Sequence, residues 1–193
     1  MTTHLAQSTT VDSNRVNGVD LNVLMETINV IKKEPEMGVC KFKASNKWSS
    51  GAHNVSKVAE FYGAKQTIQH KQTFSLHADE PAILAGNDEG ANPVEHLLHG
   101  LASCLTTSLV AHAAVRGIEI EELESELEGD LNLNGFLGLS PDTPKGFTQI
   151  RVNFKVKAGD EDMEVLRTLS EFSPVFNTLV QGVPVDVKID SKD

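Results

Sequence analysis

Residues 92–116, NPVEHLLHGLASCLTTSLVAHAAVR, contain the longest apolar stretch of the 193-residue chain, from Val94 to Val115. Asparagine is favoured as an N-cap and proline at the first helical position, so Asn92 and Pro93 predict the start of a helix. Apolar side chains occupy most of the helix circumference as far as Arg116. Such a helix must be covered on several sides, which one sheet cannot do alone.

The same stretch is long enough to span a membrane, but four ionisable residues interrupt it: Glu95, His96, His99 and His112. A fully charged side chain in hydrocarbon costs roughly 2.5–3.5 kcal/mol. We therefore interpret the stretch as a helix buried inside a soluble protein, with no membrane partner. The amino terminus lacks a basic segment followed by an apolar run, which predicts a cytoplasmic chain without a secretory signal.

Two alternating segments follow the helix. Between residues 122 and 133, leucines and other uncharged residues on one face alternate with glutamates and an aspartate on the other. Between residues 150 and 157, apolar residues alternate with Arg151, Lys155 and Lys157. Period-two alternation is typical of strands, and an acidic strand face beside a basic one favours antiparallel pairing.

The carboxy-terminal part predicts helices and a last strand. Apolar residues at helical spacing predict a helix between Met163 and Phe172, and Ser173 followed by Pro174 has the form of an N-cap and first-turn proline. A final strand is predicted from four alternating apolar residues, Val183, Val185, Val187 and Ile189.

Before the central stretch, four apolar residues at spacings of three and four predict an amphipathic helix: Leu21, Leu24, Ile28 and Ile31. Asp20 is its predicted N-cap, and Pro35 stops it. Residues 38–78 predict three strands, although residues 55–62 alternate poorly, which favours an edge strand. Residues 79–93 predict a loop whose acids are interpreted as solvated turn residues, not calcium ligands: Asp79, Glu80, Asp88 and Glu89.

The order of these elements predicts an α+β fold rather than alternating βαβ units. We divide the chain into a polar arm with an amphipathic helix, residues 1–37, and one domain, residues 38–193. The central helix has an apolar face that one small sheet leaves uncovered. A twofold dimer that exchanges coverage is the simplest solution, so a homodimer is predicted.

Composition excludes several classes of function. The formal net charge of −10 repels phosphate backbones, and 5% aromatic residues are too few for base-stacking platforms, so no nucleic-acid partner is expected. Cys40 and Cys104 are the only cysteines and form no CxxC pair, which argues against a disulfide framework or a thiolate zinc site. His96 and His99 lack further metal ligands at a suitable spacing, so no metal is predicted. The sequence contains no nucleotide-binding motif, so no cofactor is predicted either.

Cys104 carries the candidate chemistry, and two interpretations stay open. It is either a buried core cysteine or a reactive thiol whose thiolate is stabilised by another group. Glu95 lies nine residues earlier, on the opposite side of the helix and about 13 Å away along its axis, so it cannot act as a base within one helix. An activating group must come from another segment or another subunit.

The segments DEGANPVEHLLHGLASCLTTSLVAHAAVRGIEIEELESELEGDLNL, residues 88–133, and SPVFNTLVQGVPVDVKI, residues 173–189, closely resemble the OsmC/Ohr family. The resemblance spans roughly residues 38–190 and is most specific at the NP dipeptide before Cys104, the small residues around it, and the SPV segment. It implies an OsmC-like fold, an intertwined homodimer with long buried central helices sandwiched by antiparallel sheets, and active sites at the subunit interface.

The family resemblance also implies an activity. Cys104 matches the cysteine that attacks organic hydroperoxides, and Glu95 resembles the acid of broader OsmC-like members. Ser173 falls where the family has its resolving cysteine. The family's activating arginine has no counterpart, because no arginine occurs between Arg15 and Arg116. The nearby substitutes for that arginine are Lys47, Lys57 and His53.

The leading hypothesis is therefore an OsmC-like stress-protection protein that reduces organic hydroperoxides with a single cysteine, which an external thiol reductant resolves. A second hypothesis is a binding protein for an apolar or acyl small molecule, without peroxidase activity. Its pocket would be lined by Phe136, Leu137 and Phe147, with Ser173 nearby. A third is another cysteine-based reaction on an electrophilic metabolite.

Overall fold

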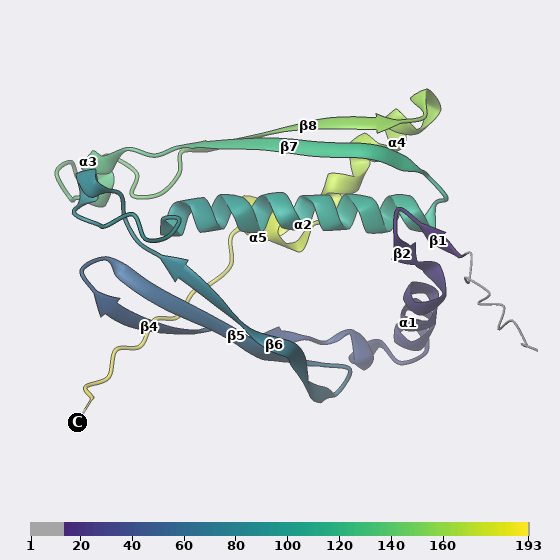
Figure 1. The fold of residues 1–193 in the computed structure, drawn as a ribbon, viewed down its shortest axis with the longest axis horizontal. Helices are drawn as coiled ribbons and strands as arrows, with labels where there is room; N and C mark the ends of the chain where they lie inside the picture. Colours follow the sequence, from purple (N-terminus) through teal and green to yellow (C-terminus); the bar gives the residue numbers. More distant parts are fainter. Residues whose placement is uncertain (1–13, 193) are drawn as a thin grey trace, which may run out of the picture.

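The central helix, α2 (Pro93–Val115), runs through the middle of the computed structural model, which describes residues 14–192 (Figure 1). Its start confirms the prediction: the Asn92 side chain accepts the N–H of Glu95 at 2.9 Å. The Glu95 carboxylate in turn accepts the N–H of Asn92 at 2.8 Å. This capping box satisfies two backbone donors that the first turn of a helix leaves without partners.

One antiparallel pair covers one side of α2. β7 (Ile120–Asp130) pairs with β8 (Gln149–Ala158), as the alternation predicts, and a short α3 (Leu133–Phe136) lies between them in the chain. The acidic face of β7 and the basic face of β8 lie on the same side of this sheet. Arg151 donates to both oxygens of Asp130 at 2.6 and 2.7 Å and to Glu128, and Lys155 lies 3.6 Å from Glu126. These pairs hold the register on the solvent side.

The hydrophobic core lies between α2, this sheet and the carboxy-terminal helices. Its buried members are Leu109, Ala113, Ile118, Leu166 and Leu169. η3 (Asp160–Asp162) precedes the helical region that we predicted, and that region is divided into α4 (Met163–Thr168) and η4 (Leu169–Phe172). α5 (Pro174–Gln181) then begins at Ser173, whose side chain accepts the N–H of Phe176 at 3.3 Å, so the predicted N-cap is confirmed.

A second sheet contains four strands, one more than predicted: β3 (Lys41–Phe42), β4 (Ser45–Ser50), β5 (His53–Gly63) and β6 (Gln66–Ala78). The prediction of an edge strand at residues 55–62 is wrong, because β5 is central and pairs with all three others. Its register against β6 shifts between Val58 and Glu60. β5 alternates poorly because it is half-buried along almost its whole length, so its side chains are not divided into a buried and an exposed face.

The arm contains a hairpin that the sequence analysis did not predict. β1 (Arg15–Val16) and β2 (Val19–Asp20) flank an Asn17–Gly18 turn with positive φ at both residues, a typical two-residue hairpin turn. The Asn17 amide donates to the Ile118 carbonyl at 2.9 Å and accepts the N–H of Ile120 at 2.8 Å. The hairpin is thereby bonded to the turn between α2 and β7.

The predicted amphipathic helix is α1 (Leu21–Lys33), and Asp20 is its N-cap as predicted. η1 (Pro35–Gly38) follows at the predicted proline. Lys65, in the turn between β5 and β6, forms ion pairs with Glu34 and Glu36. The arm therefore links the α2–β7 turn to the second sheet. The division at residue 37 stays a prediction, and residues 1–13 of the arm lie outside the described residues.

The prediction of a strand at residues 183–189 is wrong for the single chain. Within residues 14–192 this segment pairs with no strand, and its four alternating apolar side chains are all exposed. Alternation indicates how side chains would be divided between two faces, but a strand also needs a hydrogen-bonding neighbour.

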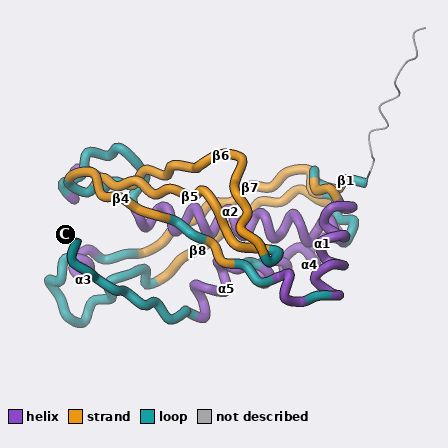
Figure 2. The backbone as a smooth tube through the Cα atoms, turned by 90° about the horizontal axis from the view of Figure 1, so that it is seen from below, coloured by secondary structure: helices purple, strands orange, loops and turns teal. Residues whose placement is uncertain are grey.

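The second sheet lies on the side of α2 opposite β7 and β8, and from below its strands pass in front of α2 (Figure 2). No strand of this sheet is among the elements that pack extensively against α2. By length and composition α2 could span a membrane, and 28% of its most apolar 18-residue window is buried in the single chain. The single chain thus leaves much of α2 uncovered, and the intertwined homodimer stays a prediction.

We predict that Asn17→Gly lowers the free energy of unfolding by about 1–2 kcal/mol, because two part-buried hydrogen bonds to the α2–β7 turn are lost. Glycine keeps the positive φ without strain, so the loss reports the side chain alone. Urea unfolding of both proteins at the same protein concentration measures the free energy of unfolding. Asn14→Ala, which removes an exposed bond to Asn22, is the control and should cost under about 0.5 kcal/mol. Equal losses for both variants would contradict the anchoring role.

Candidate functional site

Cys104 lies at the middle of α2 and is half-buried. Within residues 14–192 its sulfur has no hydrogen-bond partner and no ion pair. At 100° per residue, Leu97 and Leu101 lie about 20° and 60° away from Cys104 around the helix, so all three share one face. The dipole of α2 acts only at its ends and cannot stabilise a thiolate at this position.

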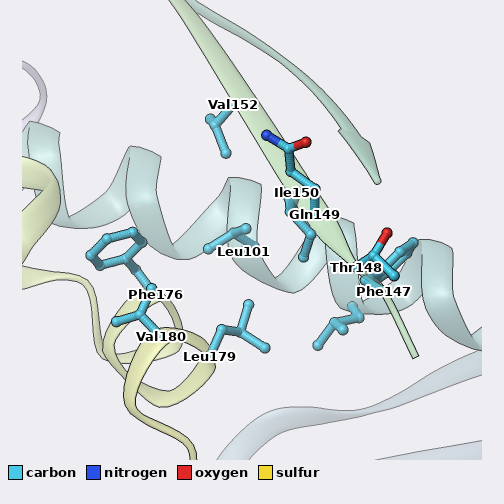
Figure 3. A pocket seen from close by; sticks show the side chains of 10 residues that line it. Leu101, Phe147, Thr148, Gln149, Ile150, Val152, Phe176, Leu179 and Val180 are labelled. Carbon is cyan, nitrogen blue, oxygen red and sulfur yellow. The ribbon is translucent and has the colours of Figure 1, made fainter. Parts of the chain in front are cut away.

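An apolar cavity of about 400 Å³ lies against the Leu97–Leu101 part of this face (Figure 3). α2, β8 and α5 form its walls, and the side chains that line it are almost all hydrophobic: Leu97, Leu101, Phe147, Ile150, Val152, Phe176, Leu179 and Val180. Thr148 and Gln149 add polar groups without charge. Cys104 does not line the cavity itself, but Leu101, which does, is one turn away on α2, about 4.5 Å along the axis.

Only one of the pocket residues named from the sequence lines this cavity. Phe147 does so, and Gly129 on β7 makes room for it: a Cβ atom there would lie 2.6 Å from the Phe147 ring. Phe136 and Leu137 are 58% and 53% exposed at α3 and do not line it. Ser173 is fully buried as the N-cap of α5, the helix that forms one wall.

The sequence analysis missed the residues that α2 and α5 contribute. Leu97 and Leu101 are four apart on α2, and Phe176, Leu179 and Val180 are three and four apart on α5. Each set marks one apolar helix face. The spacing could have identified both faces, but nothing in the sequence indicates that the two faces meet across β8.

Glu95 is not brought to Cys104 within the chain. Its carboxylate is occupied at the start of α2, where it accepts the N–H of Asn92. Nine residues of helix place it about 13 Å along the axis and on the opposite side. A joint role of Glu95 and Cys104 therefore requires two chains.

The substitutes for the family's arginine all lie on the second sheet. Lys47 pairs across the strands with Val55, and Lys57 with Ser45, so both lysines share one face of the sheet. Neither forms an ion pair within residues 14–192. His53 Nε2 lies 3.1 Å from His77 Nδ1, and His53 Nδ1 lies 3.6 Å from the Glu89 carboxylate. Within residues 14–192 none of the three forms a hydrogen bond or ion pair with the chain's own Cys104.

The loop before α2 is built around Asp79, which is 1% exposed. Its interpretation as a solvated turn acid is therefore wrong. Burial alone would raise the pKa of Asp79, but backbone N–H groups of Glu80, Glu89 and Asn87, with His53 nearby, hold it below its ordinary value. The loop conformation is thus fixed by a buried carboxylate, which hydropathy alone does not indicate.

Neither a second thiol nor a metal site adjoins Cys104 in the described part of the chain. Cys40 is exposed on the second sheet, beside Gly63. His96 Nε2 contacts the His77 carbonyl at 2.9 Å. Among residues 14–192, no three His, Cys, Asp or Glu side chains are grouped so as to hold a metal ion. The expected absence of metal and cofactor stays a prediction.

Comparison with known proteins gives a consistent family and fold. A family model described as OsmC-like protein matches residues 86–188, a little over half of the chain. No curated protein matches the chain by sequence. An OsmC-like protein from Mycoplasma pneumoniae has a similar structure, with a TM-score of 0.54 and 22% identity, over 74% of this chain and 89% of that one.

Two further solved structures are similar at the same TM-score of 0.54. One is a putative osmotic stress induced and detoxification response protein from Psychrobacter arcticus, 14% identical, over 72% of this chain and 88% of that one. The other is an OsmC-like protein of unknown function from Vibrio cholerae, 12% identical, over 72% of this chain and 92% of that one. At these identities the likeness shows the fold.

We predict that Ser173→Ala lowers the free energy of unfolding by about 1 kcal/mol, because the N-cap bond to Phe176 is lost. The rate at which iodoacetamide alkylates Cys104 should stay within twofold of wild type. Urea unfolding and intact mass measure the two quantities, and Ser49→Ala, at an exposed position of β4, is the control. A large change in alkylation rate with unchanged stability would show that Ser173 acts on the thiol instead.

Proposed function

The chain belongs to the family of OsmC-like proteins, and from that premise we propose that it protects against stress by reducing organic hydroperoxides, with Cys104 as its only redox-active cysteine. The observation that carries the proposal is the position of the thiol on the helix face that forms a wall of the apolar cavity. The cavity volume lies within the range of small-molecule sites.

The reaction has three steps. The Cys104 thiolate attacks the outer oxygen of the hydroperoxide, the O–O bond breaks, and the alkoxide leaves as an alcohol after taking a proton, so that cysteine sulfenic acid remains. An external thiol then attacks the sulfenic sulfur, forms a mixed disulfide and releases water. A second thiol attacks the mixed disulfide, which releases the oxidised reductant and restores Cys104.

The external reductant follows from the absence of a resolving thiol near Cys104. The family's resolving position holds Ser173, and Cys40 lies exposed immediately before β3, in the part of the chain that forms the second sheet. A dithiol suits this role best, because one molecule supplies the thiols for both steps. We place this activity in the cytoplasm, where thiols are kept reduced.

The lining of the cavity favours an uncharged apolar substrate. No charged side chain lines it, and burial of apolar surface there contributes about 25 cal/mol per Å². The hydrocarbon part of a hydroperoxide would lie against Leu101 and Phe176, with its O–O group directed toward Cys104. Gln149 and Thr148 supply the polar contacts.

We further propose a homodimer in which the partner supplies what the site lacks. Among residues 14–192 of one chain, no group is bonded or paired with the Cys104 thiol, and Glu95 lies on the far side of α2. In an intertwined dimer the Glu95 carboxylate of one chain acts at the Cys104 of the other. The second sheet, which has little contact with its own α2, covers the partner's helix.

A binding protein is the second candidate function. The cavity favours it, because an apolar pocket one helical turn from a thiol without an activating partner also suits binding of an apolar or acyl molecule. A third candidate, attack of Cys104 on an electrophilic metabolite, differs in its readout: alkylation of the thiol is fast and hydroperoxide is not consumed.

We predict that the purified protein consumes cumene hydroperoxide with excess dithiothreitol, and that Cys104→Ser abolishes turnover. Cys40→Ser is the matched control and should keep the wild-type rate. Intact mass after one equivalent of peroxide should show a single oxygen or thiol adduct on Cys104. If wild type does not turn over and Cys104 stays unmodified, the peroxidase proposal is wrong, and an apolar molecule that is retained through purification would favour the binding protein.

We predict that co-expression of Cys104→Ser chains with Glu95→Gln chains restores activity that neither variant has alone. The mixed dimer contains one complete site, with Cys104 from one chain and Glu95 from the other, so about a quarter of the wild-type rate is expected when chains pair at random. Glutamine keeps an acceptor for the capping bond to Asn92. A mixture that is no more active than its parents would show that Glu95 does not act across the dimer.

A further inference from the structure

Two histidines of the second sheet and one glutamate of the loop before α2 form a row of contacts that the proposed function does not use. His53 is the first residue of β5, and His77 lies near the end of β6. His53 Nε2 lies 3.1 Å from His77 Nδ1, and His53 Nδ1 lies 3.6 Å from a carboxylate oxygen of Glu89. We call these three residues the Glu–His–His triad.

The two histidine rings of the triad meet end to end rather than face to face. Their planes are 16° apart, and their centroids are 5.4 Å apart. This centroid separation matches the N···N distance extended by the radius of each ring, so the contact lies in the ring planes. Such a contact has the geometry of an N–H···N hydrogen bond.

Glu89 determines which ring nitrogens of the triad carry protons. A carboxylate only accepts, so the proton of the neutral His53 ring lies on Nδ1, towards Glu89, and Nε2 is left as an acceptor. His77 Nδ1 then donates to His53 Nε2. The remaining nitrogen, His77 Nε2, carries a lone pair and forms no hydrogen bond or ion pair with any of residues 14–192. His77 is therefore a base whose orientation and tautomer are fixed by its neighbours.

The two histidines differ in exposure. The side chain of His53 is only 14% exposed, whereas His77 is exposed. The buried Asp79 carboxylate also interacts electrostatically with the His53 ring. Two carboxylates thus act on His53, and through it they stabilise positive charge that develops on His77.

The triad lies at the same end of α2 as Glu95. His96 Nε2 contacts the main-chain carbonyl of His77 at 2.9 Å, and His96 follows Glu95 in the first turn of the helix. Cys104 of the same chain is eight residues further on, about 12 Å along the axis. The triad is therefore remote from the chain's own thiol and lies at the end of α2 that the proposed dimer brings to the partner's Cys104.

The sheet face that holds His77 also carries two lysines. Lys47 is opposite Val55 in the strand pairing, and Val55 is opposite His77, so these side chains project from one face. Lys57 follows Val55 by two residues on β5 and shares that face. An electropositive surface stabilises a thiolate, so this face favours contact with a reactive cysteine.

The proposed site needs a proton acceptor and a cation, and Glu95 supplies no cation. A carboxylate next to a thiol disfavours the thiolate, because like charges repel. The family's arginine, which would offset this repulsion, has no counterpart, because no arginine occurs between Arg15 and Arg116. A histidine that takes the thiol proton becomes an imidazolium, and the resulting ion pair provides both the acceptor and the cation.

We propose that His77 is the general base for the partner's Cys104, and that His53 and Glu89 position it. The inference rests on the proposed function, because it requires the dimer and a reactive cysteine. His77 Nε2 takes the proton of the partner's Cys104 thiol, so that a thiolate and an imidazolium form.

The same proton completes the reaction. When the thiolate attacks the outer oxygen of a hydroperoxide, the O–O bond breaks and the alkoxide takes the proton from His77 Nε2 and leaves as an alcohol. Cysteine sulfenic acid and a neutral His77 remain. The base therefore returns to its starting state within each oxidation of the thiol.

Cross-linking measures whether His77 lies at the partner's Cys104. In a Cys40→Ser background, His77→Cys adds one thiol to the native Cys104, and mild oxidation should give disulfide-linked dimers. His70→Cys is the control, because it lies seven residues earlier on β6, about 20 Å away, and should give none. Disulfides only within one chain, or equal yields of dimer from both variants, would overturn the proposal.

The rate of alkylation by iodoacetamide measures whether His77 activates the thiol, and it needs no hydroperoxide. His77→Ala should slow the alkylation of Cys104 at least tenfold at neutral pH. His70→Gln, in which only ring contacts to Phe61 and Phe74 are lost, should stay within twofold of wild type. Alkylation of the His77→Ala protein at the wild-type rate would overturn the proposal.

Mixed dimers distinguish activation across the dimer from a structural role of His77. When His77→Ala chains are co-expressed with an excess of Cys104→Ser chains, each remaining Cys104 faces an intact His77 from its partner and should regain the wild-type alkylation rate. An excess of chains that carry both substitutions should leave it slow. Equal rates in the two mixtures would overturn the proposal.

Two variants of His53 test its positioning role. Glutamine keeps an acceptor oxygen for His77 Nδ1, so His53→Gln should be alkylated at Cys104 within about threefold of the wild-type rate. Leucine has no acceptor, so His53→Leu should slow alkylation about as much as His77→Ala does, and the double variant should be no slower than His77→Ala alone. Circular dichroism confirms that each variant is folded. Equal rates for the glutamine and leucine variants would overturn the positioning role.

These outcomes are separate from those of the peroxidase assay. If wild type consumes no hydroperoxide, but His77→Ala slows alkylation and mixed dimers restore it, the peroxidase proposal is wrong and the triad is supported. Turnover by wild type together with unchanged alkylation of the His77→Ala protein would do the reverse.

Discussion

The apolar circumference of α2 is the constraint on which the rest of the structure depends. The helix has 23 residues, but the single chain buries only five of them: Leu101, Leu105, Leu109, Ala113 and Ala114. β7 and the carboxy-terminal helices pack against one side of α2, and no strand of the second sheet is among the elements that pack extensively against it. Because apolar area left in water costs free energy in proportion to its extent, the fold is complete only when another surface covers α2.

The local sequence pattern predicted correctly those helices and strands that are fixed by their own capping residues or by the alternation of their side chains. Asn92 and Pro93, Asp20, and Ser173 and Pro174 each mark a helix start that the structure confirms. The alternation of acids along β7 and of bases along β8 predicted both strands and their pairing. In these cases capping bonds and cross-strand ion pairs form between residues whose identity is visible in the sequence.

The wrong predictions concern which segments lie next to one another in the fold, not the local pattern of residues along each segment. Residues 183–189 alternate correctly, but no strand among residues 14–192 pairs with them. β5 was taken for an edge strand because its side chains are half-buried on both faces and do not alternate. Asp79 was taken for a surface acid, although three backbone N–H groups bury it. The hairpin at Asn17–Gly18 was missed, although that dipeptide is typical of such turns.

The sequence identifies Cys104 as the candidate reactive residue, but it does not identify the cavity that lies near it. Cys104 was found from the residues around it, whereas the cavity depends on how α5 crosses β8. Ser173 is the reason that the proposed reaction relies on an external thiol. A hydroxyl at that position accepts the N–H of Phe176, and a thiol is a weaker acceptor, so serine gives α5 a better start but supplies no sulfur for Cys104. The residue that begins one wall of the cavity therefore supplies no thiol, and for this reason the proposed reaction assigns resolution of Cys104 to a molecule from solvent.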